Sequence, residues 1–472
     1  MPFTTDKQTL DDLDIPGKYR GSSIFYLFNR TQTRGGEQLL ESMFQQPLSD
    51  AEAINTRSSI FQYFQRTGVA FPLSKELCDS VEQYMSAGGS GSMVGSALMI
   101  CRKKLLRDIG SDKEYDMIHA GILSLIEFIH VVNDFFTQLD PGGNVHPGKN
   151  IRPGEIECLY RETIQEVKQI INTAALKNVL AERGITRLPL LKVIKYDRLL
   201  RVGWQHAFWR VMQILYEADV YISVSRVAAD RKFVYARANP FIEARNRIDL
   251  VNVFHPQLAG AVANTVHTDH ERNVIFLTGA NMAGKSTFMK SFGIAVYLAH
   301  MGFPVAADSM AFSVQDGIFT SINVSDNLNM GYSHFYAEVV RVRQVAEEVS
   351  RSRNLVVIFD ELFKGTNVKD AYDATVAVIE AFAENRNSVF IVSTHITEAG
   401  QTLMEQCPNM LFVYFPTVMN NNIPTYTYKL QEGISGDRHG MMIIQNEGIL
   451  DILLGKSRIN FLQAPMPNSS PH

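Results

Sequence analysis

The chain has 472 residues, of which 45 are Lys or Arg and 49 are Asp or Glu, so its formal net charge is -4. This balance excludes a strongly basic protein whose whole surface binds nucleic acid, although it leaves room for a local basic stripe. Hydrophobic residues make up 46%, as in ordinary globular proteins, and the four cysteines form no CxxC pair that would indicate a zinc ribbon or a disulfide framework.

The first half of the chain is predicted to be helical, because apolar residues recur there at three- and four-residue spacing. The expected helices span residues 37–44, 50–66, 73–85, 112–138, 155–183 and 196–229. Two segments rich in Gly, Ser or Pro, 86–97 and 140–154, are predicted loops. The amino end lacks the apolar core of an export signal, and the apolar stretches 118–136 and 292–307 are interrupted or short. We therefore expect core helices and a cytoplasmic protein.

The second half changes character near Phe241, where short apolar runs begin to alternate with helical segments. Continuous apolar runs between helices predict a buried, mostly parallel sheet. The expected strands are 273–278 (NVIFLT), 355–359 (LVVIF), 388–392 (SVFIV), 410–415 (MLFVYF) and 426–430. The tail 464–472 is rich in Pro, Ser and Asn and is predicted to be disordered.

The strongest motif is GxxxxGK[ST], which matches residues 279–286 (GANMAGKS) between a predicted strand and a predicted helix. Backbone N–H groups of such a loop, together with the helix amino end, form a concave anion site. Lys285 would reach the β- and γ-phosphates of a nucleotide, and the Ser286 hydroxyl would ligate Mg²⁺. The bland alternative is a glycine-containing turn. The predicted nucleotide-binding residues are Gly279, Ala280, Asn281, Met282, Ala283, Gly284, Lys285, Ser286 and Thr287.

Two further elements are expected at the carboxyl ends of neighbouring strands. Asp360 and Glu361 follow the strand 355–359, and His395 follows the strand 388–392. We interpret Asp360 as the carboxylate beside Mg²⁺, and Glu361 as the catalytic residue that polarises the attacking water. His395 is placed to sense the γ-phosphate, although a lone histidine is more often structural. With Lys285, these residues form the predicted catalytic set.

These residues carry a family resemblance. TGANMAGKST (278–287) resembles the phosphate loop of the MutS family of DNA mismatch-repair ATPases, usually TGPNMGGKST, and departs from it at Ala280 and Ala283. Further segments resemble the family in chain order: residues 39–55 and 217–228 resemble its core domain, and the others are His255-Pro256, Asp326-Asn327-Leu328, the S-x-F-x-x-E signature of Ser333, Phe335 and Glu338, and 363–366 (FKGT) where the family has GRGT.

The resemblance implies a multidomain chain with an all-α core and lever domain at 1–245, an α/β P-loop NTPase domain of the ABC type at 246–463, and the disordered tail 464–472. It also implies a DNA-associated ATPase that uses ATP and Mg²⁺. The family's head-to-tail dimer would place Ser333 in trans on the γ-phosphate bound at Lys285. ATP binding would close this homodimer on DNA. The resemblance further implies a role in mismatch repair, other repair or recombination proteins as partners, and no association with membranes.

Several features argue against direct mismatch readout. The core-like sequence begins close to Met1, so the family's mismatch-recognition and connector domains are not expected, and 137–200 shows no β-rich DNA clamp. Small basic clusters such as Arg102-Lys103-Lys104 suit solvated helix faces as well as a phosphate-contacting stripe, so no DNA contacts are assigned.

Two other functions stay open. One is a nucleotide-dependent assembly switch, and the other is a transporter's nucleotide subunit, which lacks its LSGGQ signature here. The family's adenine-stacking position falls at Ala261 and Val262.

Overall fold

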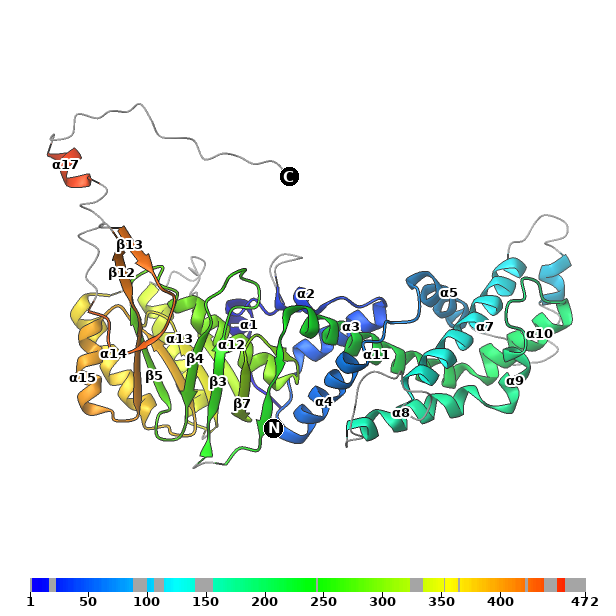
Figure 1. Cartoon of the computed structure of the whole chain (residues 1–472), viewed down its shortest axis with the longest axis horizontal. Helices are drawn as coiled ribbons and strands as arrows, with labels where there is room; N and C mark the ends of the chain where they lie inside the picture. The colour runs from blue at the N-terminus through cyan, green and yellow to red at the C-terminus, as the bar shows by residue number, and fades with distance from the viewer. Residues whose placement is uncertain are drawn as a thin grey trace. The chain divides into compact units, whose positions relative to one another are not determined.

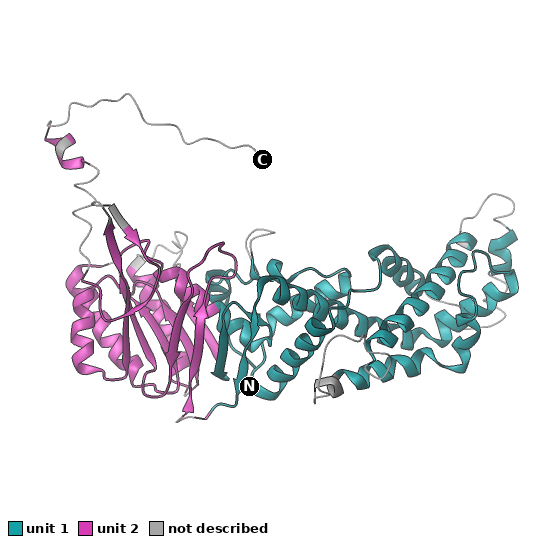
Figure 2. Ribbon diagram, viewed as in Figure 1, with its two compact units in different colours: residues 1–241, 294–316 teal, residues 242–293, 317–472 magenta. Residues whose placement is uncertain are grey.

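The structure, a computed structural model, describes residues 2–16, 23–87, 100–105, 114–140, 156–242, 245–322, 334–351, 353–363, 366–420, 423–436 and 448–454. The chain divides into two compact units (Figure 2). One, the helical unit, comprises residues 1–241 and 294–316, and the other, the sheet unit, comprises 242–293 and 317–472. Each unit therefore draws on two separate parts of the sequence. The domain limits expected from the family stay a prediction.

In the helical unit, buried residues between Tyr63 and Ile222 form a large apolar cluster to which several helices contribute. Asp6, Ser23, Thr33, Asp50 and Ser74 each accept a hydrogen bond from the first turn of the helix that they precede, which fixes where five helices begin. The described helices are α1 (Lys7–Asp12), α2 (Ile24–Phe28), α3 (Arg34–Gln45), α4 (Ala51–Thr67), α5 (Lys75–Ser86), α7 (Glu114–Leu139), α8 (Ile156–Ile171), α9 (Ala174–Leu180), α10 (Leu190–Arg198), the π-helix η1 (Leu199–Gly203) and α11 (Gln205–Arg231) (Figure 1).

Two predicted helices are broken in the structure. The helix expected over 155–183 ends at Ile171, because the Asn172 side chain donates to the Lys168 carbonyl at 2.9 Å and Thr173 takes an extended backbone. The helix expected over 196–229 is interrupted by η1 and by Trp204. The indole of Trp204 is 6% exposed within the apolar cluster, so burial of this ring overrides regular helical hydrogen bonding. The other predicted helices of this half lie within a few residues of their observed counterparts, and the expected loops lie almost wholly outside the described residues.

Among the described residues, one helix is long and apolar enough to cross a membrane, the part of α7 from Tyr115 to Leu139. Half of this segment is buried, and residues such as Ile122, Phe128 and Phe136 belong to the apolar cluster of the helical unit. This is the pattern of a core helix, as the polar interruptions in its sequence predict.

The segment 294–316 completes the helical unit. It contains the end of α12 (Lys285–His300), with β6 (Pro304–Val305) paired to β1 (Val234–Tyr235) and β7 (Ser309–Ser313) paired to β2 (Arg237–Asn239). The Tyr297 hydroxyl donates to the Phe44 carbonyl at 2.6 Å. The ring of Phe303 lies 5.4 Å from that of Phe44 and 5.0 Å from that of Phe61, centroid to centroid. The helical unit thus depends on residues far downstream in the sequence.

The sheet unit is organised by a six-stranded sheet with the strand order β14-β11-β5-β10-β9-β8. All neighbouring pairs are parallel except β11 with β14. The strands of this unit are β3 (Ile248–Val253), β4 (Asn264–Thr268), β5 (Val274–Gly279), β8 (Gly317–Ser321), β9 (Leu355–Phe359), β10 (Val389–Ser393), β11 (Met410–Phe415), β12 (Thr417–Asn420), β13 (Ile423–Tyr426) and β14 (Gln431–Glu432). The predicted parallel sheet of 273–278, 355–359, 388–392 and 410–415 is therefore confirmed.

The described helices of the sheet unit are the start of α12, then α13 (His334–Val349), α14 (Val368–Ala383), α15 (Thr397–Gln406) and α17 (Ile449–Leu453). The ring of Phe382 on α14 lies 5.0 Å from Phe390 of β10 and 5.8 Å from Phe359 of β9, so this helix covers the centre of the sheet. Because β5, β9 and β10 are parallel, their carboxyl ends meet at one edge, where ligands bind in open α/β sheets.

The prediction of a strand over 426–430 is wrong beyond Tyr426, where β13 ends. Tyr428 has a left-handed backbone with φ 54°. Asn264 donates to the Tyr428 carbonyl at 3.0 Å and accepts from the Leu430 N–H at 2.8 Å. An amide side chain therefore takes the hydrogen bonds that a neighbouring strand would make, and the turn carries the Tyr428 ring to the edge of the sheet.

Candidate functional site

The phosphate loop joins β5 to α12, as its sequence predicts. Gly279 and Gly284 have φ angles of 138° and 106°, which L side chains rarely adopt. A Cβ at Gly279 would lie 3.1 Å from the Phe415 carbonyl oxygen, so both glycines are required by the local geometry. Met282 is left-handed at φ 67° and 83% exposed, whereas Ala283 is buried and has no positive φ. The methyl group at position 283 therefore fits where the family usually has glycine.

Lys285, the first residue of α12, lies folded over its own loop. Its ammonium donates to the carbonyls of Gly279 at 2.9 Å and Ala280 at 3.2 Å, and the side chain is 5% exposed. Burial lowers the pKa of Lys285, and the carboxylates of Asp360 and Glu361 offset part of this effect. A cation held by neutral carbonyls in a shielded loop can exchange those partners for the oxygens of an anionic ligand.

Ser286 and Asp360 meet across the sheet edge. The Ser286 hydroxyl donates to Asp360 Oδ2 at 2.5 Å, which brings together the two residues predicted to hold Mg²⁺. Mg²⁺ prefers oxygen ligands, and it usually takes one or two from the protein and the rest from phosphates and water. The hydroxyl and carboxylate present here fit that donor set. Among the described residues, no group of three or more His, Cys, Asp or Glu side chains offers an alternative metal site.

Glu361 and His395 form a second pair beside Asp360. His395 Nε2 lies 2.5 Å from Glu361 Oε1, and Glu361 adopts a left-handed backbone with φ 54°. Such a conformation is uncommon for a residue other than glycine and is often found at functional sites. The structure therefore brings the predicted acid and histidine into direct contact, so His395 is placed to orient the Glu361 carboxylate.

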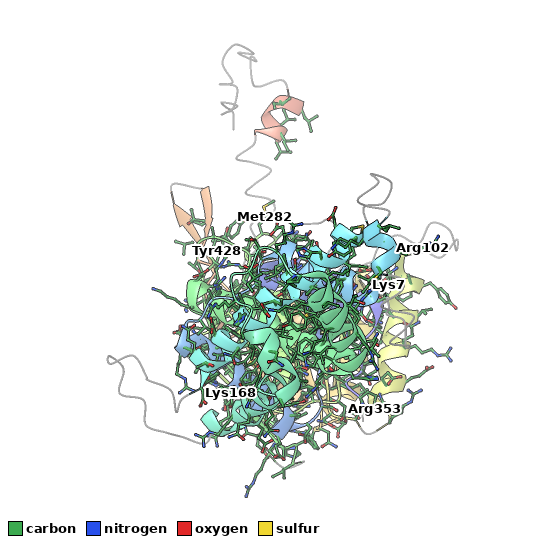
Figure 3. All side chains as sticks on the ribbon, turned by 90° about the vertical axis from the view of Figure 1, so that its right-hand side faces the viewer. Lys7, Arg102, Lys168, Met282, Arg353 and Tyr428 are labelled. Carbon is green, nitrogen blue, oxygen red and sulfur yellow. The ribbon has the colours of Figure 1, made fainter. Side chains whose placement is uncertain are left out.

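A pocket of about 490 Å³ opens beside the phosphate loop within the sheet unit. Met282 and Tyr428, both labelled in Figure 3, line it. Ala261 and Val262, where the family's adenine-stacking position falls, also line it. The aromatic residues of this pocket were not predicted from the sequence: they are Phe288 on α12, Phe415 at the end of β11 and Tyr428. The only signal in the sequence was the alternation of Tyr426 and Tyr428, which alone indicates a strand.

Tyr428 is the aromatic residue best placed to contact a ligand. It is 45% exposed, and its ring lies so close to the loop that a Cβ at Gly284 would approach Tyr428 Cδ1 at 3.1 Å. His255, from the HP element, lines the same pocket, and its burial lowers the pKa of its imidazole, with a smaller effect from Lys290. The pocket thus offers a flat ring and a neutral imidazole next to the phosphate loop.

Some predicted residues lie outside the described part of the chain. These are Ser333, the Asp326-Asn327-Leu328 segment and Lys364 with Gly365. Phe335 of the signature segment is described, and its ring lies 5.9 Å from that of Phe363, which has a left-handed backbone with φ 60°. Three basic residues, Arg226, Arg231 and Lys232, are exposed near the end of α11. Exposure is equally the property of an ordinary solvated helix face, so these residues identify no DNA contact.

Comparison with known proteins gives two matches to family models. The model of MutS domain III matches residues 8–225, and the model of MutS domain V matches residues 275–459. The chain is 23% identical over 535 residues to the DNA mismatch repair protein MutS of Lysinibacillus sphaericus, covering 96% of the chain and 62% of that relative. It is 25% identical over 517 residues to the protein of the same name from Streptococcus pyogenes serotype M3, covering 92% and 59%. The chain thus spans about three fifths of the length of these relatives.

Proposed function

Because the chain belongs to the MutS family and carries its domains III and V, we propose that it is a DNA-associated ATPase that binds ATP with Mg²⁺ and hydrolyses it to ADP and phosphate. The observation that carries this proposal is the convergence of Ser286, Asp360 and the Glu361–His395 pair at one sheet edge. Domain V is the family's ATPase domain, and these contacts bring together the residues that we assign to Mg²⁺ and to the attacking water, which supports the proposal.

The residues have distinct roles in this proposal. The loop N–H groups and Lys285 hold the phosphates, while Ser286 and Asp360 hold Mg²⁺, which neutralises developing negative charge when bound. Glu361 accepts a proton from the attacking water, and His395 keeps its carboxylate oriented through the contact with Oε1. The ring of Tyr428 lies against the adenine. The exposed Tyr428 ring and the neighbouring phosphate loop support this assignment.

We propose further that two copies of the chain act as a homodimer on DNA in the cytoplasm, with Ser333 of each copy completing the other's site. Nucleotide binding would favour the closed dimer only if ATP binds that state more tightly than the open one. The curated relatives are named as mismatch repair proteins, which supports a role in DNA repair. In this proposal the chain contacts the DNA phosphates and does not read the bases, because no base-reading residues are identified.

The test compares ATP turnover by the wild type, Glu361→Gln and Lys285→Ala. Glu361→Gln should keep nucleotide binding and lose about 100-fold or more in turnover, because the glutamine cannot accept the proton. Lys285→Ala should lose nucleotide binding. Glu384→Gln, an exposed change in the same unit, is the matched control and should behave as the wild type.

Wild-type turnover no greater than that of Glu361→Gln would refute hydrolysis and favour a nucleotide-dependent assembly switch. The DNA part is tested separately by titrating duplex, branched and single-stranded oligonucleotides with and without ATP at several salt concentrations. Binding that weakens steeply with salt is expected, since phosphate contacts release counterions. No binding to any of these oligonucleotides at low salt would overturn the DNA association.

A further inference from the structure

The buried hydroxyl of Ser393 joins the two acidic residues of the site. Ser393 ends β10 and is 0% exposed. Its Oγ donates a hydrogen bond to Asp360 Oδ1, and the same Oγ accepts one from the Glu361 N–H at 3.2 Å. The Ser393 carbonyl also accepts from this N–H, at 3.1 Å. One residue of β10 thus holds both residues that follow β9.

The contact with Asp360 fixes the orientation of its carboxylate. Ser286 donates to Oδ2 and Ser393 donates to Oδ1, so each carboxylate oxygen has a hydroxyl partner on a different element. An ionised carboxylate oxygen has about two acceptor positions. Each oxygen therefore keeps a free direction toward a cation, while rotation of the carboxyl group would break one of the two hydrogen bonds.

The contact with Glu361 fixes its backbone. The N–H of Glu361 is shared between the carbonyl and the hydroxyl of Ser393, next to a left-handed φ of 54°. A non-glycine residue in this region is strained and persists only when its surroundings hold it there. The same turn directs the side chain to His395.

We propose that Ser393 is a positioning residue that sets the Mg²⁺ dependence of nucleotide binding by holding Asp360 in its metal-facing orientation. The inference rests on the proposed function and deepens it, because it assigns to this chain a residue beyond the phosphate loop and the two acids. Partners that orient a metal ligand from outside the coordination sphere typically contribute 10–100-fold to metal affinity or activity.

The chain contains a matched control in Ser388, just before the other end of β10. Ser388 is also 0% exposed, and its hydroxyl likewise bridges to the segment of β9. It donates to the Arg353 carbonyl at 3.0 Å and accepts from the Leu355 N–H at 3.1 Å. The two serines therefore lie at opposite ends of β10 and share full burial and a hydroxyl that both donates and accepts, but Ser388 contacts neither acid among the hydrogen bonds of the described residues.

The experiment measures the dissociation constant of a fluorescent ATP analogue in excess Mg²⁺ and in EDTA, using the full chain. Ser393→Ala should reduce the Mg²⁺-dependent gain in affinity about tenfold and leave the affinity in EDTA unchanged. Ser388→Ala should leave both values unchanged. Ser393→Thr restores a hydroxyl and should recover most of the Mg²⁺-dependent gain. A cooperative thermal unfolding transition, measured for every variant, serves as the check that each variant is folded.

The outcomes separate this inference from the function on which it rests. A wild type that binds the analogue no better than Lys285→Ala would refute the nucleotide site, and the role of Ser393 with it. A wild type that gains affinity with Mg²⁺, beside a Ser393→Ala variant that gains as much as Ser388→Ala, would overturn the role of Ser393 alone. A folded Ser393→Thr variant that stays as weak as Ser393→Ala would overturn it too, because the hydroxyl would then be irrelevant.

Discussion

The imidazole of His300 should make the helical unit unstable in mild acid. His300 is fully buried at the end of α12, where Nε2 accepts the Gln315 N–H at 2.9 Å and Nδ1 lies 2.8 Å from the Val296 carbonyl. A neutral ring with its proton on Nδ1 satisfies both contacts, whereas a protonated ring would turn Nε2–H against the Gln315 N–H. The rings of Phe3 and Phe312 lie 4.6 Å and 4.8 Å from the imidazole and exclude water. Burial consequently lowers the pKa of His300 from 6.5 to about 4.

The sign and size of the effect follow from this shift. Between pH 4 and 6.5 the unfolded chain binds a proton that the folded chain does not bind. The stabilisation is therefore complete above pH 6.5 and is lost as the pH falls toward 4. Between pH 7.5 and pH 5 the free energy of unfolding should drop by about 2 kcal/mol from this group alone, approaching ~3 kcal/mol below pH 4.

The assay is urea unfolding at pH 7.5 and pH 5, followed by tryptophan fluorescence. Trp204 and Trp209 are the chain's two tryptophans and both lie in the helical unit, so the signal reports that unit. His300→Gln removes the titrating group but keeps an acceptor oxygen, and its pH-induced loss should be smaller than the wild type's by about 2 kcal/mol. His206→Gln, on the exposed side of α11, should lose as much as the wild type. Equal losses in wild type and His300→Gln would refute the reasoning.

Two further predictions concern single side chains. Tyr428→Ala should weaken ATP binding about fivefold, through loss of a ring contact worth ~1 kcal/mol, and should leave the urea midpoint unchanged. Unchanged affinity in a nucleotide titration would contradict the placement of this ring against the base. Asp219→Ala should lower the free energy of unfolding by about 3 kcal/mol, because the buried carboxylate accepts from the N–H groups of Gln32 and Thr33 and from the Thr33 hydroxyl. Asp230→Ala, which removes an exposed ion pair, should change it by less than about 1 kcal/mol; equal losses in the two variants would count against the burial argument.

The phosphate site was predictable because its signals are local. The glycine pattern and Lys285-Ser286 lie in one strand–loop–helix segment, and Asp360, Glu361 and His395 directly follow apolar runs. Parallel strands with adjacent carboxyl ends then bring these residues together. The contacts between Ser286 and Asp360 and between Glu361 and His395 need only that topology.

Other features depend on tertiary contacts that no local pattern encodes. Tyr428 reaches the pocket because Asn264, far upstream, takes the hydrogen bonds of the turn around it. The predicted helix is interrupted at Trp204 because the indole is buried there, although the flanking sequence has the pattern of a continuous helix. The role inferred for Ser393 follows from its register beside β9, since its sequence position marks only the end of a strand.

The discontinuous composition of the helical unit has a consequence for dissecting the protein. A fragment ending at residue 241 would lack Tyr297, His300 and Phe303, and would leave the rings of Phe28, Phe44 and Phe61 without their partner. The complementary fragment would carry Tyr297 and Phe303 without the residues of the helical unit that bury them. The apolar cluster of the sheet unit lies within the second fragment, whereas the helical unit loses part of its core to that fragment. We therefore expect that a cut at the boundary suggested by the two family domains does not give two autonomous folding units.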